Sequence, residues 1–275
     1  MANNVWGYNP SIPAAAIFLI LFVIATVWHG YLLVRTKSWY WIPFFIGGIF
    51  QIIGYVARIA GHNHETSILI FSIQNLTILL APALYAASIY MVLGRVISSL
   101  RAPHLSIIPL KWLTKIFVMG DILSFMAQCA GSFLFPGGGM MASGGSNSGI
   151  QITIVGLIIQ LVFFGIFLVT AVIFHKRKRK DSSSHMEHET FISTPSKRHW
   201  TTLLWALYAV GILILVRSFY RLIEFIDGYG GYIMSHEAFL YVFDALLMSS
   251  AMFIMVRYHP SFTLQRVGKD AWIPL

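Results

Sequence analysis

Seven apolar stretches of about 20 residues each restrict what this chain can fold into more than any other feature. A helix crosses the ~30 Å hydrocarbon core of a bilayer in about 20 residues, so each stretch is long enough to span it. Lipid offers no partner for backbone N–H and C=O groups, and the strands of a closed barrel would alternate apolar and polar residues, which these stretches do not. Charged residues make up 11% of the chain, whereas soluble proteins carry about 25%. The sequence therefore predicts an all-α membrane protein, a seven-transmembrane helix bundle with spans at about 14–34, 41–60, 68–92, 113–134, 150–174, 202–225 and 237–256.

The spans divide the chain into one domain and two polar segments. Residues 1–260 form the predicted transmembrane domain, residues 175–200 a basic cytosolic link, and residues 261–275 a short cytosolic tail. The link opens with the basic run Lys176 to Lys180. We expect this run to bind anionic headgroups of the inner leaflet, each residue contributing about 1 kcal/mol near the surface. The alternative is that the run serves only as a topology signal.

Lysine and arginine lie on one side of the predicted membrane. Of the 19 Lys and Arg residues, all but three follow the first, third, fifth and seventh spans, and the opposite links have none. An excess of Lys and Arg marks the cytosolic side. With seven spans, the N-terminus is then predicted outside and the C-terminus in the cytosol. This distribution also accounts for the net charge of +9 without any nucleic-acid partner.

The remaining three arginines and four acidic residues lie within the predicted spans. A charge near the middle of a bilayer costs about 3 kcal/mol on insertion scales, so such residues face a partner or a polar cavity and are functional candidates. With the polar residues of the same spans, they form the predicted ligand-binding set. Its members are Arg58, Gln74, Asp121, Gln128, Gln160, Arg217, Arg221, Glu224, Glu237, Tyr241 and Asp244, with His29 and Tyr55 as further possible contacts.

Helical spacing groups these residues by face. Arg217, Arg221 and Glu224 stand at i, i+4 and i+7, and Glu237, Tyr241 and Asp244 repeat that spacing in the seventh span. Facing helices would place the set around a polar cavity that opens outward. The alternative is structural, with Arg221 and Glu224 forming a plain ion pair.

Close helix packing is expected at glycines within the spans. Gly54, Gly131, Gly156 and Gly165 are placed at helix–helix contacts, because a small residue lets two backbones approach.

The residues give little support for enzyme chemistry or for a metal cofactor. Intramembrane zinc sites need several His ligands at helical spacing, and His29 alone lies well inside a span. The chain also lacks the phosphate-binding pattern of P-loop enzymes. His29 is interpreted either as a hydrogen-bonded packing residue or as an axial ligand to haem. We therefore predict a non-enzymatic protein without a resident cofactor, with haem or porphyrin possible as a ligand.

The intramembrane motifs resemble those of the fungal RTA-like proteins, the lipid-translocating exporter family. The motifs, in order, are Tyr8-x-Pro10-Ser11, Gly54-Tyr55-x-x-Arg58, Gln74-x-x-x-x-Leu79-x-Ala81-Pro82, Asp121-x-x-Ser124-x-x-x-Gln128-x-x-Gly131, Gly156-Leu157-x-x-Gln160, Arg217-x-x-Tyr220-Arg221-x-x-Glu224, Glu237-x-x-x-Tyr241-x-x-Asp244 and His259-Pro260. The resemblance runs from about Tyr8 to Pro260, with one departure at Gln51, where the family often has an acid. It implies a fungal protein of the plasma membrane or, alternatively, the vacuolar membrane. It also implies a role in export or tolerance of sphingoid bases, in resistance to aminosterol-type drugs, or in porphyrin movement.

The leading hypothesis is a membrane protein that binds and exports or translocates an amphipathic, lipid-like molecule such as a sphingoid base or a sterol-like drug. Its ammonium group would pair with Asp244 or Glu237, whereas a phosphate or carboxylate would pair with the arginines. Two alternatives remain, a seven-helix receptor or regulator that senses lipid and a porphyrin or haem transporter. Against the receptor, the third span ends in Leu93-Gly94-Arg95 rather than in a charged triplet.

Overall fold

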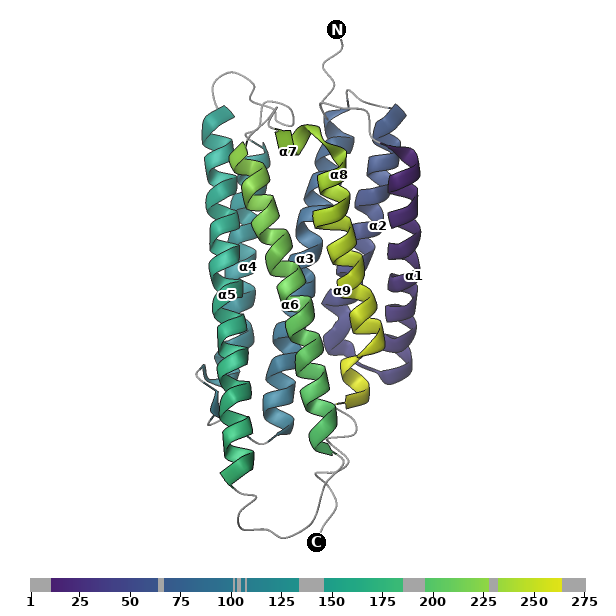
Figure 1. The fold of residues 1–275 in the computed structure, drawn as a ribbon. Helices are drawn as coiled ribbons and strands as arrows, with labels where there is room; N and C mark the ends of the chain where they lie inside the picture. The colour runs from purple at the N-terminus through teal and green to yellow at the C-terminus, as the bar shows by residue number, and fades with distance from the viewer. Residues whose placement is uncertain are drawn as a thin grey trace.

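Each predicted span is a helix in the computed structural model, and the helices lie side by side (Figure 1). The structure describes residues 11–63, 67–100, 102, 105–106, 108–133, 146–184, 196–227 and 232–263. The first six spans are α1 (Ile12–Thr36), α2 (Ile42–Asn63), α3 (Ile68–Ser99), α4 (Leu110–Phe133), α5 (Ser146–Ser184) and α6 (Ser196–Asp227), with a short 3-10 turn at Trp39–Trp41 before α2. The seventh consists of α8 (Glu237–Leu240), a π-helical turn (Tyr241–Ala245) and α9 (Leu246–Arg257), after the one-turn helix α7 (Tyr232–Ser235). The described residues contain no strand, and the seven long apolar helices confirm the predicted fold class.

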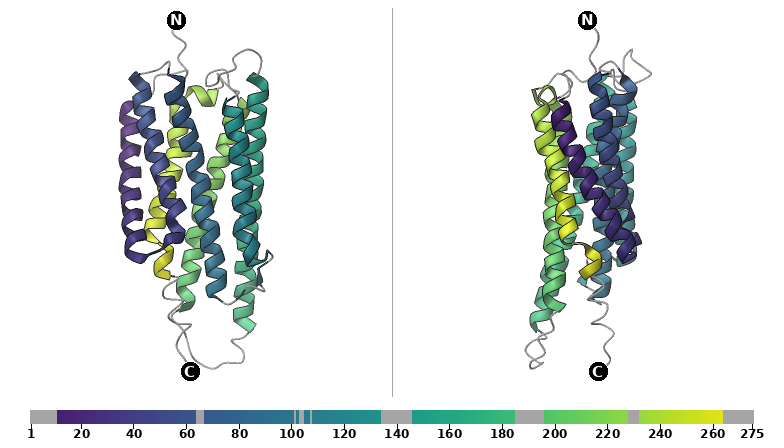
Figure 2. Two further views of the ribbon diagram at one scale, coloured as in Figure 1. Left: turned by 180° about the vertical axis from the view of Figure 1, so that it is seen from behind. Right: turned by 90° about the vertical axis from the view of Figure 1, so that its right-hand side faces the viewer.

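Helices that follow one another in the chain pack together, and the last one closes the bundle. α1 contacts α2, and the series continues through α6, which packs against α9. α9 in turn contacts α1, so the ring closes, while α3 also reaches α6. The two side views in Figure 2 show the same arrangement. The most buried of the seven spans is that of α3, which brings its polar residues into the interior.

The outer surface of the bundle is apolar. α1 exposes Val27 and Val34 on one face, while Phe22 and His29 on the other are fully buried. A water-soluble bundle would reverse this pattern, because its apolar stripe faces inward. The apolar exterior is the surface that lipid covers.

Three of the four predicted glycine contacts are confirmed. A Cβ atom at Gly54 would lie 2.5 Å from Ile78 Cγ1, and one at Gly156 would lie 2.8 Å from the Ser124 carbonyl oxygen. Gly131 is equally close to α5. The prediction for Gly165 is wrong, because no atom lies within 4 Å of the position its Cβ would take. Gly54 and Gly156 thus set the close approach of α2 to α3 and of α4 to α5.

α5 continues as a helix well beyond its apolar part. The run Lys176 to Lys180 belongs to the helix, which ends at Ser184, whereas the sequence places this run in a polar link. Lys and Arg are good helix formers, and cations near a helix C-terminus interact favourably with its dipole. The run lies at the end of the bundle where α1, α3 and α9 finish and α6 begins (Figure 1). Arg35, Arg95 and Arg257 belong to the C-terminal parts of α1, α3 and α9 and so lie at this same end. We call this end the basic end.

Candidate functional site

Asp244 joins two arginines of α6. Arg217 Nε donates to Asp244 Oδ1 at 2.8 Å, and Arg221 Nη2 donates to Asp244 Oδ2. Arg221 also pairs with Glu224 at 2.8 Å, as its i, i+3 spacing allows. Tyr220 donates a hydrogen bond of 3.3 Å to the same glutamate. All these side chains are less than 9% exposed, so this cluster is a buried set of two cations and two anions.

The proline of α3 explains why Arg217 also contacts a backbone carbonyl of that helix. Proline has no N–H, so Pro82 cannot donate the helical hydrogen bond to the carbonyl of Ile78, four residues before it. Arg217 Nη2 donates to that carbonyl at 2.8 Å instead. The carbonyl that Pro82 leaves without its helical donor therefore accepts a hydrogen bond from the buried guanidinium of Arg217.

A second cluster ties α2 to the start of the seventh span. Arg58 Nη2 pairs with Glu237 Oε1 at 2.8 Å, and Arg58 Nε donates to the Tyr241 hydroxyl at 3.1 Å. The Tyr241 hydroxyl also donates to Glu237 at 2.9 Å. Glu237 accepts a further bond from the backbone N–H of Ser11, at the start of α1. Arg58 is fully buried, while 18% of the Glu237 side chain is exposed.

Tyr55 lies between the two clusters. Its ring is fully buried beside Phe22 and Tyr241. The hydroxyl interacts electrostatically with Asp244 of the first cluster and with Arg58 of the second. It has no hydrogen-bond partner within the described structure. We call the two clusters together the arginine network: it comprises Arg58, Arg217, Arg221, Glu224, Glu237 and Asp244, three cations matched by three anions.

The fourth intramembrane acid stands apart from this network. Asp121 on α4 is 5% exposed, and neither of its carboxylate oxygens has a hydrogen-bond partner among the described residues. Its interacting neighbour is the Tyr90 hydroxyl of α3, which lies near without meeting hydrogen-bond geometry. Further along α4, Gln128 Nε2 donates to Gln160 Oε1 of α5 at 3.0 Å. We call Tyr90, Asp121, Gln128 and Gln160 the Asp121 region.

Two candidates lie outside both groups. Gln74 on α3 is buried. His29 is also buried, and Trp41 Nε1 donates to its Nδ1 at 3.2 Å. The other ring nitrogen, Nε2, then donates to the Met252 carbonyl at 3.1 Å. Both nitrogens are occupied, so neither is available as an axial ligand in this arrangement. Within the described ranges, no group of three His, Cys, Asp or Glu residues could hold a metal ion.

The predicted set leaves out several buried polar residues near these clusters. Tyr85 donates to Met252 Sδ at 3.1 Å, and Gln51 is fully buried with both amide atoms lacking partners in the part of the chain described. The helical spacing already places Gln51 on one face with Tyr55 and Arg58, although Gln51 is not in the predicted set. No comparable signal identifies Tyr90.

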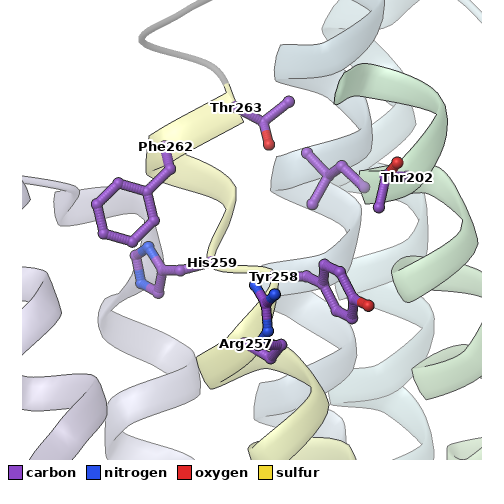
Figure 3. A pocket seen from close by; sticks show the side chains of 7 residues that line it. Thr202, Arg257, Tyr258, His259, Phe262 and Thr263 are labelled. Atoms are coloured by element: carbon purple, nitrogen blue, oxygen red, sulfur yellow. The ribbon is translucent and has the colours of Figure 1, made fainter. Parts of the chain in front are cut away.

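A polar pocket of about 310 Å³ opens at the basic end, between the end of the seventh span and the start of α6. Figure 3 shows His259 and Phe262 on one side of the chain, and Tyr258 and Thr202 on the other. The His259 ring packs near Trp41, with ring centroids 5.6 Å apart. This pocket is lined by none of the predicted site residues.

Comparison of the sequence with known proteins places this chain in a family with relatives in yeast. The RTA1 like protein family matches residues 44–267. The Saccharomyces cerevisiae protein called Protein RTM1 is 40% identical over 226 residues, which are 82% of this chain and 69% of that relative. Protoporphyrin uptake protein 1 of the same yeast is 31% identical over 278 residues, 88% of each chain. A yeast sphingoid long-chain base transporter, RSB1, is 25% identical over 304 residues, 100% of this chain and 78% of the relative. No solved structure matches the chain.

Proposed function

The chain belongs to the RTA1-like family, and we propose that it binds an amphipathic, lipid-like molecule inside its helix bundle and translocates it across the membrane. The names of two relatives, a sphingoid long-chain base transporter and a protoporphyrin uptake protein, are consistent with membrane transport rather than with an enzyme. The observation that carries the proposal is the arginine network, a buried set of three cations and three anions on facing helices.

The ligand we favour is cationic, with a sphingoid base as the example. Its ammonium group would approach Glu237, whose side chain is the most exposed of the network at 18%. Arg58 would then release Glu237 but keep the Tyr241 hydroxyl at 3.1 Å and the Tyr241 ring, whose centroid is 5.2 Å from its guanidinium carbon. A buried arginine left without a partner would cost about 3–5 kcal/mol, and this second partner reduces that cost.

The same exchange is available deeper in the bundle. An ammonium at Asp244 would compete with Arg217 and Arg221. Arg221 would keep Glu224, and Arg217 would keep the Ile78 carbonyl. Each arginine therefore has a second acceptor, so a charged headgroup can pass between acids without leaving a bare guanidinium. The hydrocarbon tail would remain beside the apolar helix faces.

A porphyrin is the second candidate ligand, and its carboxylates would pair with the arginines. The 31% identity to a protoporphyrin uptake protein favours it. In this case recognition would use Arg58 and Arg217 rather than His29, whose ring nitrogens are both engaged.

We further propose that the basic end faces the cytosol, following the distribution of Lys and Arg. The basic run Lys176 to Lys180 would then meet the anionic inner leaflet. The plasma membrane is the expected location, with the vacuolar membrane as the alternative.

The test is movement in purified vesicles. We expect labelled sphingoid base to cross vesicles that contain the protein several-fold faster than protein-free vesicles of the same lipid. Saturable binding without movement would instead support a lipid-sensing receptor, and movement of protoporphyrin alone would select the second ligand. Vesicles with and without protein that behave alike toward both compounds would contradict the proposal.

A further inference from the structure

A groove lies on the outside of the bundle, between the basic-end halves of α5 and α6. The two helices are in contact there through Tyr208 of α6 and the Ala171 carbonyl of α5, and the groove has a volume of about 370 Å³. It is lined by neither the arginine network nor the Asp121 region. A pocket of this size accepts part of a lipid or a small ligand.

The α5 wall changes from apolar to cationic along its length. Leu168, Val172, Lys176 and Arg179 line the groove and recur at i, i+4, i+8 and i+11, one face of the helix. The distance from Leu168 to Arg179 along the axis is about 16 Å, at 1.5 Å per residue. The groove therefore has an apolar half toward the middle of the bundle and a cationic half toward the basic end. A phospholipid in the membrane has the same order, with its acyl chain toward the middle and its phosphate at the surface.

Aromatic side chains of α6 form the facing wall and contact α5. Tyr208 of α6 donates to the Ala171 carbonyl at 3.0 Å. His175 stacks on Tyr208 with ring centroids 5.8 Å apart and planes at 16°, and it meets the edge of Trp205 at 6.1 Å. Trp and Tyr concentrate at the membrane interface, where one part of the ring is apolar and the other polar. Trp205 is 63% exposed, so lipid reaches the groove sideways.

The cations of the groove have no acidic partner in the described chain. Arg177, which does not line the groove, donates to the Leu105 carbonyl at 3.3 Å. In contrast, Lys176 and Arg179 form no hydrogen bond or ion pair with the described residues. Both are exposed, and two unpaired positive charges beside an apolar groove favour a ligand with net negative charge.

We propose that this groove is a specific binding site for one anionic phospholipid of the leaflet at the basic end. Its phosphate and acidic headgroup lie between Lys176 and Arg179, and one acyl chain lies along Leu168 and Val172 against Ile212. The site is separate from the arginine network and does not depend on which ligand that network binds. The bound lipid joins α5 to α6 at a position where the aromatic contacts already hold them together.

The test is lipid binding to the full-length protein in neutral detergent, measured by native mass spectrometry or by the shift in melting temperature. The probes are phosphatidylserine and phosphatidylcholine with identical chains. The groove variant is Lys176→Gln with Arg179→Gln. The matched control is Arg177→Gln with Lys180→Gln. It removes the same number of positive charges from the same basic run, at two positions that do not line the groove.

We expect wild-type protein to bind phosphatidylserine at least 10-fold more tightly than phosphatidylcholine. The groove variant should lose about 30-fold in affinity for phosphatidylserine, as two headgroup interactions predict, whereas the control should lose less than about 3-fold. Equal losses in both variants would mean a diffuse basic surface and would overturn the site, as would equal affinity for the two lipids.

Ile212→Trp, which fills the apolar half of the groove, should also lower the affinity for phosphatidylserine about 10-fold. An unchanged affinity in that variant would overturn the acyl-chain assignment. None of these outcomes bears on transport by the arginine network.

Discussion

The arginine network and the Asp121 region differ in whether their buried acids are paired with a cation. In the network every acid has an arginine within 2.8 Å or closer, and the set is neutral as a whole. In the Asp121 region a carboxyl group lies against α3 with no cation and no hydrogen bond inside the described structure. Because a charge in the low-dielectric interior is stable only when it is paired, the first region contributes to folding through its ion pairs. The second holds an acid without a charge partner in the described structure, and we expect that folding does not depend on its charge.

The largest effect is expected at Asp244, which neutralises two arginines. Asp244→Asn would leave Arg217 without an ion-pair partner and Arg221 with Glu224 alone, so we expect a loss of about 3–5 kcal/mol in stability. Thermal unfolding of detergent-purified protein measures it. Asp227→Asn, the same change at an exposed position, serves as the control and should change stability by less than about 0.5 kcal/mol. An Asp244→Asn variant as stable as wild type would remove the distinction between the two regions.

A smaller effect is expected when an ion pair is removed as a unit. Arg221→Ala alone leaves Glu224 without its guanidinium and should cost about 3 kcal/mol. Adding Glu224→Ala should recover part of this loss, because Arg217 and Asp244 still form a neutral pair. The coupling energy from the double-mutant cycle should fall between about 0.5 and 3 kcal/mol. Additive losses would show that the two side chains do not interact.

The network also depends on the close approach of α2 to α3. Gly54→Ala would place a Cβ atom 2.5 Å from Ile78 Cγ1, next to the carbonyl that Arg217 contacts, and should cost about 1–3 kcal/mol through overpacking. Gly165→Ala is the matched control, since nothing lies within 4 Å of its Cβ position. It should gain up to about 1 kcal/mol from helix propensity. Equal shifts in melting temperature for the two variants would contradict the packing assigned to Gly54.

The smallest effect is expected at Asp121. Asp121→Asn removes a buried carboxyl group that has no charge partner, so stability should stay the same or rise by about 1 kcal/mol. The amide has nearly the same shape as the carboxyl group, so the packing beside the Tyr90 hydroxyl is kept. A loss of more than about 2 kcal/mol would reveal a partner for Asp121 and make the two regions alike.

The sequence predicts the helices better than their rotations about their own axes. Span length and hydropathy identify all seven helices, and the spacing of Arg221 and Glu224 within one helix correctly anticipates their ion pair at 2.8 Å. The pairing of Arg58 with Glu237, which are 179 residues apart, depends on how two distant helices face each other. The π-helical turn around Asp244 also changes the direction in which the side chains of the seventh span point. The pattern of apolar residues in the sequence does not reveal this turn. For the same reason Asp121 is grouped with the other acids by residue type, although in the structure its neighbour is Tyr90.

The central claim, that the arginine network binds the headgroup of the transported molecule, is tested most directly by a charge-neutral change at its most exposed pair. Arg58→Gln with Glu237→Gln removes one cation and one anion together, so the protein should remain within about 2 kcal/mol of wild-type stability. The measurement is the rate at which purified variants move labelled sphingoid base across vesicles, compared with wild type and with Asp121→Asn. We predict at least a 10-fold lower rate for the double variant and a rate within about 2-fold of wild type for Asp121→Asn. A folded double variant that moves the base at the wild-type rate would contradict the claim.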